Sequence, residues 1–252
     1  MQFIDSHSHL DFPDFDSDRE QAIADANKAG VSDIIISATT AKRWPLIKTI
    51  AEKPCCHAAY GLHPMFMAEH NSRDIDALKQ WIKRESVIAI GEIGLDFFIK
   101  NYNEDEQIAL FIAQLKIASE YDLPVIIHAR KSLDIVLKQL RHFKTLRGSI
   151  HSFSGSEQQA KQLIDLGFYL GFGGPITYTR ATRLRQLVSN LALESMLLET
   201  DSPDQPDATH YAERNEPAYL PIIAETIAEL KSIEVEEVAR ITTQNAQNLF
   251  NF

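Results

Sequence analysis

A short aliphatic run, a polar turn and an amphipathic stretch recur in that order along the 252 residues of this chain. The runs are Phe3–Asp5, Asp33–Ser37, His57–Tyr60, Val87–Ile90, Val125–Ile127, Ser149–Ile150, Phe168–Leu170 and Met196–Leu198. Runs such as Val125–Ile127 are apolar on both faces, which is typical of parallel strands covered by helices. The intervening stretches, for example Ile108 to Leu115, place apolar residues at helical spacing. The pattern therefore predicts alternating strands and helices.

The number and spacing of these units favour a closed barrel. The strand ends recur about every 27 residues, and eight such units make up a (β/α)8 barrel of the TIM type. A doubly wound open sheet is the alternative, although it usually has fewer strands. The barrel is favoured because reactive side chains follow so many of the runs, at the face where barrel enzymes build their sites. We expect one barrel domain over residues 1–252, with a closing helix at Ile222–Lys231 and an appended C-terminal helix at Val235–Phe250.

Charge and composition restrict the classes of function. Acidic residues number 35 against 25 basic ones, and the net charge is −10. This balance excludes a protein that binds nucleic acid mainly through a broad basic surface, but not a nuclease whose metal ions bind the phosphate. The chain contains no apolar run near the ~18 residues of a membrane span and starts without signal-peptide features. Its cysteines, Cys55 and Cys56, are adjacent and cannot build a disulfide framework. We expect a cytoplasmic, monomeric enzyme with no membrane partner.

The first run ends in two histidines, His7 and His9. Side chains two apart on a strand share a face, so both imidazoles can point to one spot at the barrel mouth. Neutral imidazole is the commonest metal ligand. Taken alone, the pair fits a metal site and two surface histidines equally well.

Four further residues of ligand type follow other runs in the same way. They are Glu92, His128, His151 and Asp201. Each alone has a structural explanation, such as a buried histidine bound to a carbonyl or an aspartate that caps a helix. Six such residues at matching ends of five strands are not explained as independent coincidences. Their convergence predicts a metal site at the C-terminal face of the barrel.

Four imidazoles and two carboxylates suit two divalent ions better than one, since each ion needs three or four protein ligands. We assign His7, His9 and Asp201 to one ion and His128 and His151 to the other. The carboxylate of Glu92 bridges both ions, because each of its oxygens can reach a separate one. Two ions about 3.5–4 Å apart hold a shared hydroxide as nucleophile and clamp a phosphoryl group.

Two of these residues are also the catalytic candidates. Asp201 is the candidate to accept a proton from the nucleophilic water, and Glu92 is the bridge that holds both ions. The ligand types do not choose among Mg²⁺, Mn²⁺ and Zn²⁺.

With these motifs the chain resembles the TatD-type deoxyribonucleases of the metal-dependent hydrolase superfamily. The resemblance rests on His7–His9, Gly91–Asp96, His128–Arg130, His151–Gly155 and Glu199–Pro203, and it runs from Phe3 to Asn248. It implies metal ligands from the first, fourth, fifth, sixth and eighth motifs, and hydrolysis of DNA, often as a 3′ exonuclease with Mg²⁺ or Mn²⁺. Some relatives remove D-amino acids from tRNA. The loop Ser202–Asp207 resembles a less characterised branch of the family, and substrate choice depends on such loops.

Four other residues are candidates for supporting roles. His63, Arg130 and Arg214 are predicted to contact the substrate, the arginines by bidentate binding of phosphate. The alternatives are a loop histidine and two surface salt bridges. Glu199 shares a face with Asp201 and is predicted to hold a ligand imidazole or a water; the alternative is a core ion pair.

The leading hypothesis is a metal-dependent hydrolase that cleaves phosphodiester bonds in DNA, as a 3′–5′ exonuclease. The alternative is an amide or ester hydrolase on the same barrel, including D-aminoacyl-tRNA deacylation, because metal-activated water attacks carbonyl carbon as readily as phosphorus. A non-enzymatic scaffold is the third possibility, although a scaffold does not need the proton acceptor Asp201. For a chain of net charge −10 we expect few DNA contacts and a shallow salt dependence of binding.

Overall fold

Eight parallel strands follow one another around a barrel in a computed structural model that describes residues 1–251. The strands are β1 (Phe3–Ser8), β2 (Val31–Ser37), β3 (Cys56–Tyr60), β4 (Ala89–Asp96), β5 (Val125–Arg130), β6 (Gly148–Ile150), β7 (Phe168–Phe172) and β8 (Met196–Leu198). Each strand pairs with the next one along the chain, in the order β1 to β8. The predicted (β/α)8 barrel is confirmed, and the open doubly wound sheet is excluded.

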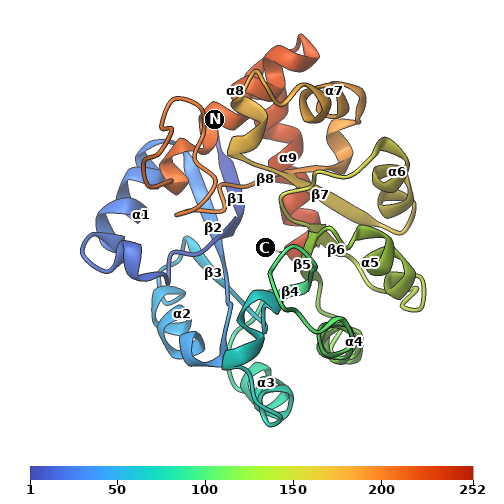
Figure 1. Ribbon diagram of the computed structural model, residues 1–252. Helices are drawn as coiled ribbons and strands as arrows, with labels where there is room; N and C mark the ends of the chain where they lie inside the picture. The colour runs from blue at the N-terminus through green and yellow to red at the C-terminus, as the bar shows by residue number, and fades with distance from the viewer. Residues whose placement is uncertain (252) are drawn as a thin grey trace.

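A ring of helices covers the outside of the strands (Figure 1). The helices are α1 (Arg19–Lys28), α2 (Trp44–Ile50), α3 (Asp74–Ile82), α4 (Glu104–Glu120), α5 (Leu133–Leu140), α6 (Glu157–Asp165), α7 (Thr182–Asn190), α8 (Leu220–Lys231) and α9 (Val235–Phe250). Their apolar faces pack on the strands in one large buried cluster, which is why strands such as β2 and β5 are apolar on both faces. No helix within residues 1–251 is long and apolar enough to cross a bilayer.

Hydrogen bonds join the first strand to the segment that follows the last one. The backbone N–H of Asp201 donates to the carbonyl of His7 at 2.9 Å. Two residues before His7 on β1, the carboxylate of Asp5 accepts hydrogen bonds from the backbone N–H and the hydroxyl of Thr200, at 2.9 and 2.6 Å. These bonds close the barrel at its C-terminal mouth, where the candidate ligands of both segments lie.

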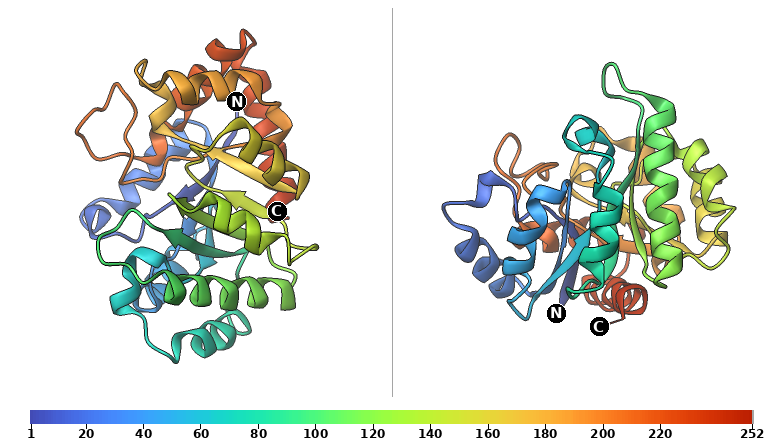
Figure 2. Two further views of the ribbon diagram at one scale, coloured as in Figure 1. Left: turned by 45° about the vertical axis from the view of Figure 1, so that its right-hand side comes forward. Right: turned by 90° about the horizontal axis from the view of Figure 1, so that it is seen from below.

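The C-terminal helix α9 plugs the opposite end of the barrel. Inward-facing apolar residues of the strands form a second cluster with Ala246, Leu249 and Phe250 of α9. The N-terminus lies at this end as well (Figure 2). The predicted bounds of α9 are confirmed, whereas α8 begins at Leu220 and not at Ile222. The difference arises because Pro221 lies in the first turn, where a missing N–H costs nothing.

The fourth strand is longer than the sequence pattern indicates. The predicted run ended at Ile90, but β4 continues to Asp96 because Ile93 to Asp96 pair with the last residues of β5 after a break in register. Glu92 and His128 therefore lie within strands and not after them. A strand anchored by pairing on the neighbouring strand holds its side chains more rigidly than a loop does.

The plug by α9 leads to a stability prediction. Leu249 is 1% exposed, so Leu249→Ala leaves a cavity at the closed end of the barrel. We expect the free energy of unfolding to fall by about 2–5 kcal/mol. Denaturant unfolding followed by circular dichroism measures it, with the exposed Gln244→Ala on the same helix as control, which should change it by less than about 0.5 kcal/mol. Equal midpoints for the two variants would contradict the plug.

Candidate metal centre

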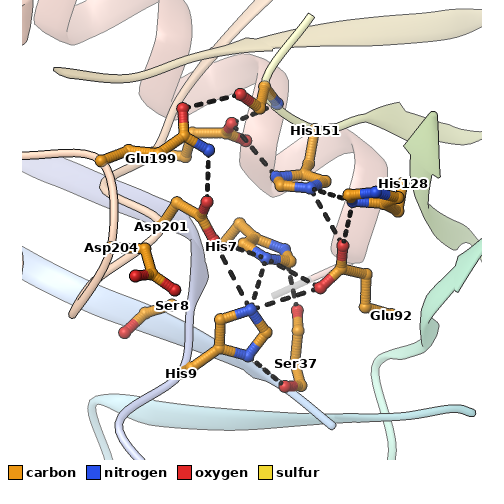
Figure 3. A network of polar contacts seen from close by, with 12 residues as sticks. His7, Ser8, His9, Ser37, Glu92, His128, His151, Glu199, Asp201 and Asp204 are labelled. Atoms are coloured by element: carbon orange, nitrogen blue, oxygen red, sulfur yellow. Dashed lines mark hydrogen bonds and ion pairs between the residues drawn. The ribbon is translucent and has the colours of Figure 1, made fainter. Parts of the chain in front are cut away.

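The predicted ligands converge at the C-terminal mouth of the barrel (Figure 3). Strand β1 supplies one imidazole and the residue just after it another, β4 supplies the carboxylate, β5 an imidazole, and the residues after β6 and β8 the last two groups. In chain order these residues are His7, His9, Glu92, His128, His151 and Asp201. All are buried except His128, which is half-buried. Three overlapping sets within this cluster, one of which includes His63, bring their ligand atoms close enough to hold a metal ion.

One set of ligand atoms surrounds the first oxygen of the Glu92 carboxylate. Its Oε2 lies 3.3 Å from Nε2 of His7 and 3.3 Å from Nε2 of His9. Asp201 Oδ1 lies 3.3 and 3.5 Å from the same two nitrogens. Four ligand atoms from three separate elements thus face one point.

The second oxygen of Glu92 faces a different set of imidazoles. Oε1 lies 2.9 Å from His63 Nε2, 3.1 Å from His128 Nδ1 and 2.9 Å from His151 Nε2. The two oxygens of one carboxylate are therefore divided between two groups of ligands. This division is the geometry that a bridging carboxylate requires.

The first set fits a divalent cation in both spacing and bonding. Ligands at about 2.0–2.1 Å in a tetrahedron are about 3.4 Å apart, and five of the six separations among the four atoms here are 3.2–3.5 Å. Glu92 Oε2 is buried and receives no hydrogen bond. A buried carboxylate oxygen without a donor is costly unless a cation binds it.

The far nitrogens of two imidazoles are fixed by hydrogen bonds. His9 Nδ1 lies 2.9 Å from the carbonyl of Ser37, and His128 Nε2 lies 3.1 Å from Asp96 Oδ2. An N–H that donates to such an acceptor leaves the opposite nitrogen unprotonated and directed at the site. Asp96 was not among the predicted site residues. The signal that the sequence offers is its spacing, four residues after Glu92, which puts both side chains on one face if the strand continues.

Glu199 lies beside the ligand His151. Its Oε1 is 3.6 Å from His151 Nδ1 and accepts a hydrogen bond from the backbone N–H of Ser152. Gly171 makes room for it, since a Cβ there would lie 2.1 Å from Glu199 Oε2. Glu199 therefore lies next to a candidate ligand imidazole, and its role in holding that imidazole stays a prediction.

His63 differs from the other imidazoles in its protonation state. Its Nδ1 accepts the backbone N–H of Met65 at 3.0 Å, so the neutral ring carries its proton on Nε2 and donates to Glu92. Burial, reinforced by the neighbouring His128, lowers the pKa of His63 to about 4, against the pull of Glu92. His63 is therefore a neutral hydrogen-bond donor that faces the cavity.

The electrostatics of the cluster favour charged carboxylates. Burial alone would raise the pKa of Glu92, but the surrounding imidazoles outweigh it and hold that pKa well below its ordinary value. Hydrogen bonds with His7 and His9 likewise outweigh burial and hold the pKa of Asp201 well below its ordinary value. Burial alone would lower the pKa of His9 and His151, but the carboxylates outweigh it and raise both well above the ordinary value. Protons therefore occupy imidazole sites that a metal ion would otherwise take.

A cavity of about 520 Å³ opens over this cluster, and Arg130 lines it. The Arg130 guanidinium stacks on the ring of Phe98, 3.8 Å from its centroid. Asp204 and Gln205 of the loop after β8 also line the cavity. The sequence predicted a role in substrate choice for this loop but not for these two residues. The Gln205 amide donates to Asp201 Oδ2 and accepts from the Ser152 hydroxyl at 2.9 Å.

The structure does not bring Arg214 to this cavity. Its guanidinium binds Asp18 at 2.7 and 2.8 Å and Glu216 at 2.7 Å, and it lies 4.5 Å from the centroid of the Phe15 ring. The predicted substrate contact at Arg214 is therefore replaced by the alternative, a salt bridge. The physical reason is that two carboxylates of the flanking segments use its donors.

A (β/α)8 barrel with histidines and carboxylates gathered at the C-terminal ends of its strands defines a class of metal-dependent hydrolases. The sequence profile of the family described as TatD related DNase matches residues 4–251, and the chain belongs to this family.

Individual relatives agree with this assignment over the full length. The chain is 39% identical to the uncharacterized metal-dependent hydrolase YjjV of Escherichia coli K12, covering 99% of this chain and 98% of the relative. It is 35% identical to the uncharacterized metal-dependent hydrolase YabD of Bacillus subtilis 168, with 98% of each covered. The crystal structure of YjjV, a TatD homolog from E. coli K12, superposes with a TM-score of 0.95 at 38% identity, over 99% of this chain and 98% of that one.

The raised pKa values of His9 and His151 predict how metal binding depends on pH. In the metal-free protein these imidazoles hold protons that a cation must displace, so binding releases protons. We expect metal affinity to rise with pH between about pH 6 and pH 8 and to level off above the raised pKa values. Calorimetric titration in buffers of different ionisation enthalpy measures the protons released. Affinity independent of pH over this range would refute the expectation.

The contact between Asp96 and His128 yields a second prediction. Asp96→Asn keeps the Oδ1 acceptor for the Phe98 N–H but removes the charge that orients His128. We expect metal affinity to fall about 10–100-fold in competition with a chromophoric chelator. The exposed Asp165→Asn serves as the charge-matched control. Equal affinities in the two variants would show that Asp96 does not orient the ligand.

Proposed function

We propose that this protein hydrolyses phosphodiester bonds of DNA with two divalent ions, acting as a 3′–5′ exonuclease. The observation that carries the proposal is the Glu92 carboxylate, whose two oxygens face two separate groups of ligand atoms. Two-ion sites of this kind suit displacement at phosphorus, because both the attacking and the leaving oxygen need charge stabilisation. The family profile, described as TatD related DNase, supports DNA as the substrate.

The ligand assignment follows from the two groups of atoms. His7, His9 and Asp201 would hold one ion, His128 and His151 would hold the other, and Glu92 would contribute one carboxylate oxygen to each. When bound, the ions supply Lewis acidity and lower the pKa of water. Mg²⁺, Mn²⁺ and Zn²⁺ are the candidates for these mixed nitrogen and oxygen ligands.

The chain's own residues orient the reactants. Asp201 accepts a proton of the attacking water as the new P–O bond forms, and its charged carboxylate suits it to this role. The ester P–O bond breaks in the same step, and the leaving oxygen takes a proton from solvent water. Gln205 fixes the orientation of that carboxylate through Oδ2. The exposed guanidinium of Arg130 binds a phosphate oxygen at the rim. His63 lines the same cavity, and its neutral Nε2–H, which faces Glu92 Oε1 in this structure, is the group that would donate a hydrogen bond to a substrate oxygen.

The experiment uses protein stripped with a chelator and then given Mg²⁺, Mn²⁺ or Zn²⁺ separately. Each sample is incubated with single-stranded DNA labelled at its 5′ end. We expect a ladder that shortens from the 3′ end. Glu92→Gln should slow it by at least about 100-fold, because the bridge between the ligand groups is lost. The control is Glu225→Gln, which neutralises an exposed carboxylate on α8 and should leave the ladder intact.

Two other results would redirect the proposal. Intact DNA with every metal, together with hydrolysis of an aminoacyl ester or an amide, would favour the second hydrolase hypothesis. Cleavage at equal rates by the wild type and Glu92→Gln would exclude the bridge as the basis of catalysis.

A further inference from the structure

A second hollow lies beside the metal centre at the same mouth of the barrel. Its volume is about 460 Å³, within the range of about 300–1,000 Å³ typical of small-molecule sites. One wall is the segment after β7, with the 3-10 turn Gly174–Thr177 and the start of α7, and the other is the loop after β8. The lining residues are Pro175, Tyr178, Arg180, Ala181, Gln205, Pro206, Tyr211 and Ala212.

Gln205 connects this hollow to the metal centre. Gln205 lines both cavities, and its side-chain amide binds Asp201 Oδ2 on the side of the metal centre. A ligand that extends out of the metal centre past Gln205 therefore enters the second hollow directly.

Aromatic rings form the surface of the hollow. Tyr211 is 66% exposed, and its ring meets Tyr178 edge-on, with centroids 6.3 Å apart. The Tyr178 hydroxyl donates to the carbonyls of Pro206 and Asp207 at 3.0 and 3.2 Å, which fixes that ring in place. An exposed aromatic face at the edge of a polar site offers a surface on which a nucleobase can stack.

A guanidinium without an acidic partner completes the hollow. Arg180 lies 4.9 Å over the Tyr178 ring, and no ion pair involves it within residues 1–251. Arg214, by contrast, forms ion pairs with Asp18, at the start of α1, and with Glu216. In a chain with net charge −10, an exposed arginine left without a carboxylate is a ready partner for a phosphate.

We propose that the hollow lined by Tyr178, Arg180 and Tyr211 is a subsite for single-stranded DNA, which holds the nucleotide next to the one at the metal centre. Its base stacks on Tyr211 and its phosphate binds Arg180. The strand then runs from Arg130 on one side of the metal centre, past Gln205, to Arg180. This inference rests on the proposed DNA substrate and adds where the strand leaves the site.

The test measures binding by the metal-loaded protein apart from cleavage. The probe is a short fluorescein-labelled single strand with phosphorothioate linkages, which resist hydrolysis, followed by fluorescence anisotropy. Tyr211→Ala should weaken binding about 5- to 150-fold, the effect of one stacked base, while Tyr211→Phe should retain it. Arg180→Ala should reduce the salt dependence by about 0.7 in log–log slope, the value for one phosphate of a single strand.

The matched control is Arg141→Ala, which removes an exposed positive charge at the end of α5, away from the mouth. It should leave both affinity and salt slope as in the wild type. Affinity of Tyr211→Ala equal to that of the wild type would overturn the subsite, as would failure of the wild type to bind the probe. Hydrolysis is measured in a separate assay with unmodified DNA. If the probe binds through Tyr211 but unmodified DNA is not hydrolysed, the proposed function alone is overturned. Hydrolysis without any effect of Tyr211 would overturn the subsite alone.

Discussion

A charged carboxylate inside the mouth of a protein barrel must be surrounded by groups that compensate for its lost hydration. Glu92 is 1% exposed, and five imidazoles lie within 3.3 Å of its oxygens. An isolated buried carboxylate costs several kcal/mol, so it shifts its pKa upward unless cations or donors face it. Here the surrounding imidazoles instead hold the pKa of Glu92 well below its ordinary value.

The barrel supplies this environment by bringing distant segments to one rim. Backbone hydrogen bonds from Asp201 to His7 and from His9 to Ser202 join the first strand to the segment after the last one. They bring candidate ligands almost two hundred positions apart in the sequence into one group. At the other end α9 fills the interior, so the mouth is the face left open. Stability and function therefore occupy opposite ends of the barrel, as in other folds of this type.

The sequence was sufficient to predict the fold and the convergence of ligands, but not the finer geometry. Strand periodicity and the types of residue at strand ends predicted the barrel and brought His7 and Asp201 to one rim. Strand pairing beyond Gly91 could not be predicted, because it depends on the register with β5. The ion pair of Arg214 could not be predicted either, because its partner Asp18 is far away in the sequence. Interactions between distant segments are the ones that local patterns do not contain.

If Glu92 joins two ion sites, the number of metal ions bound per chain depends on its carboxylate. Metal-free protein is equilibrated with excess Mn²⁺ or Zn²⁺ and separated from the free ions. Its metal content is then determined by inductively coupled plasma mass spectrometry. The wild type should hold two ions per chain, His128→Asn one, and Glu92→Gln fewer than either. A single ion in the wild type, or two ions retained in Glu92→Gln, would contradict the bridge and leave the cluster as an ordinary single-ion site.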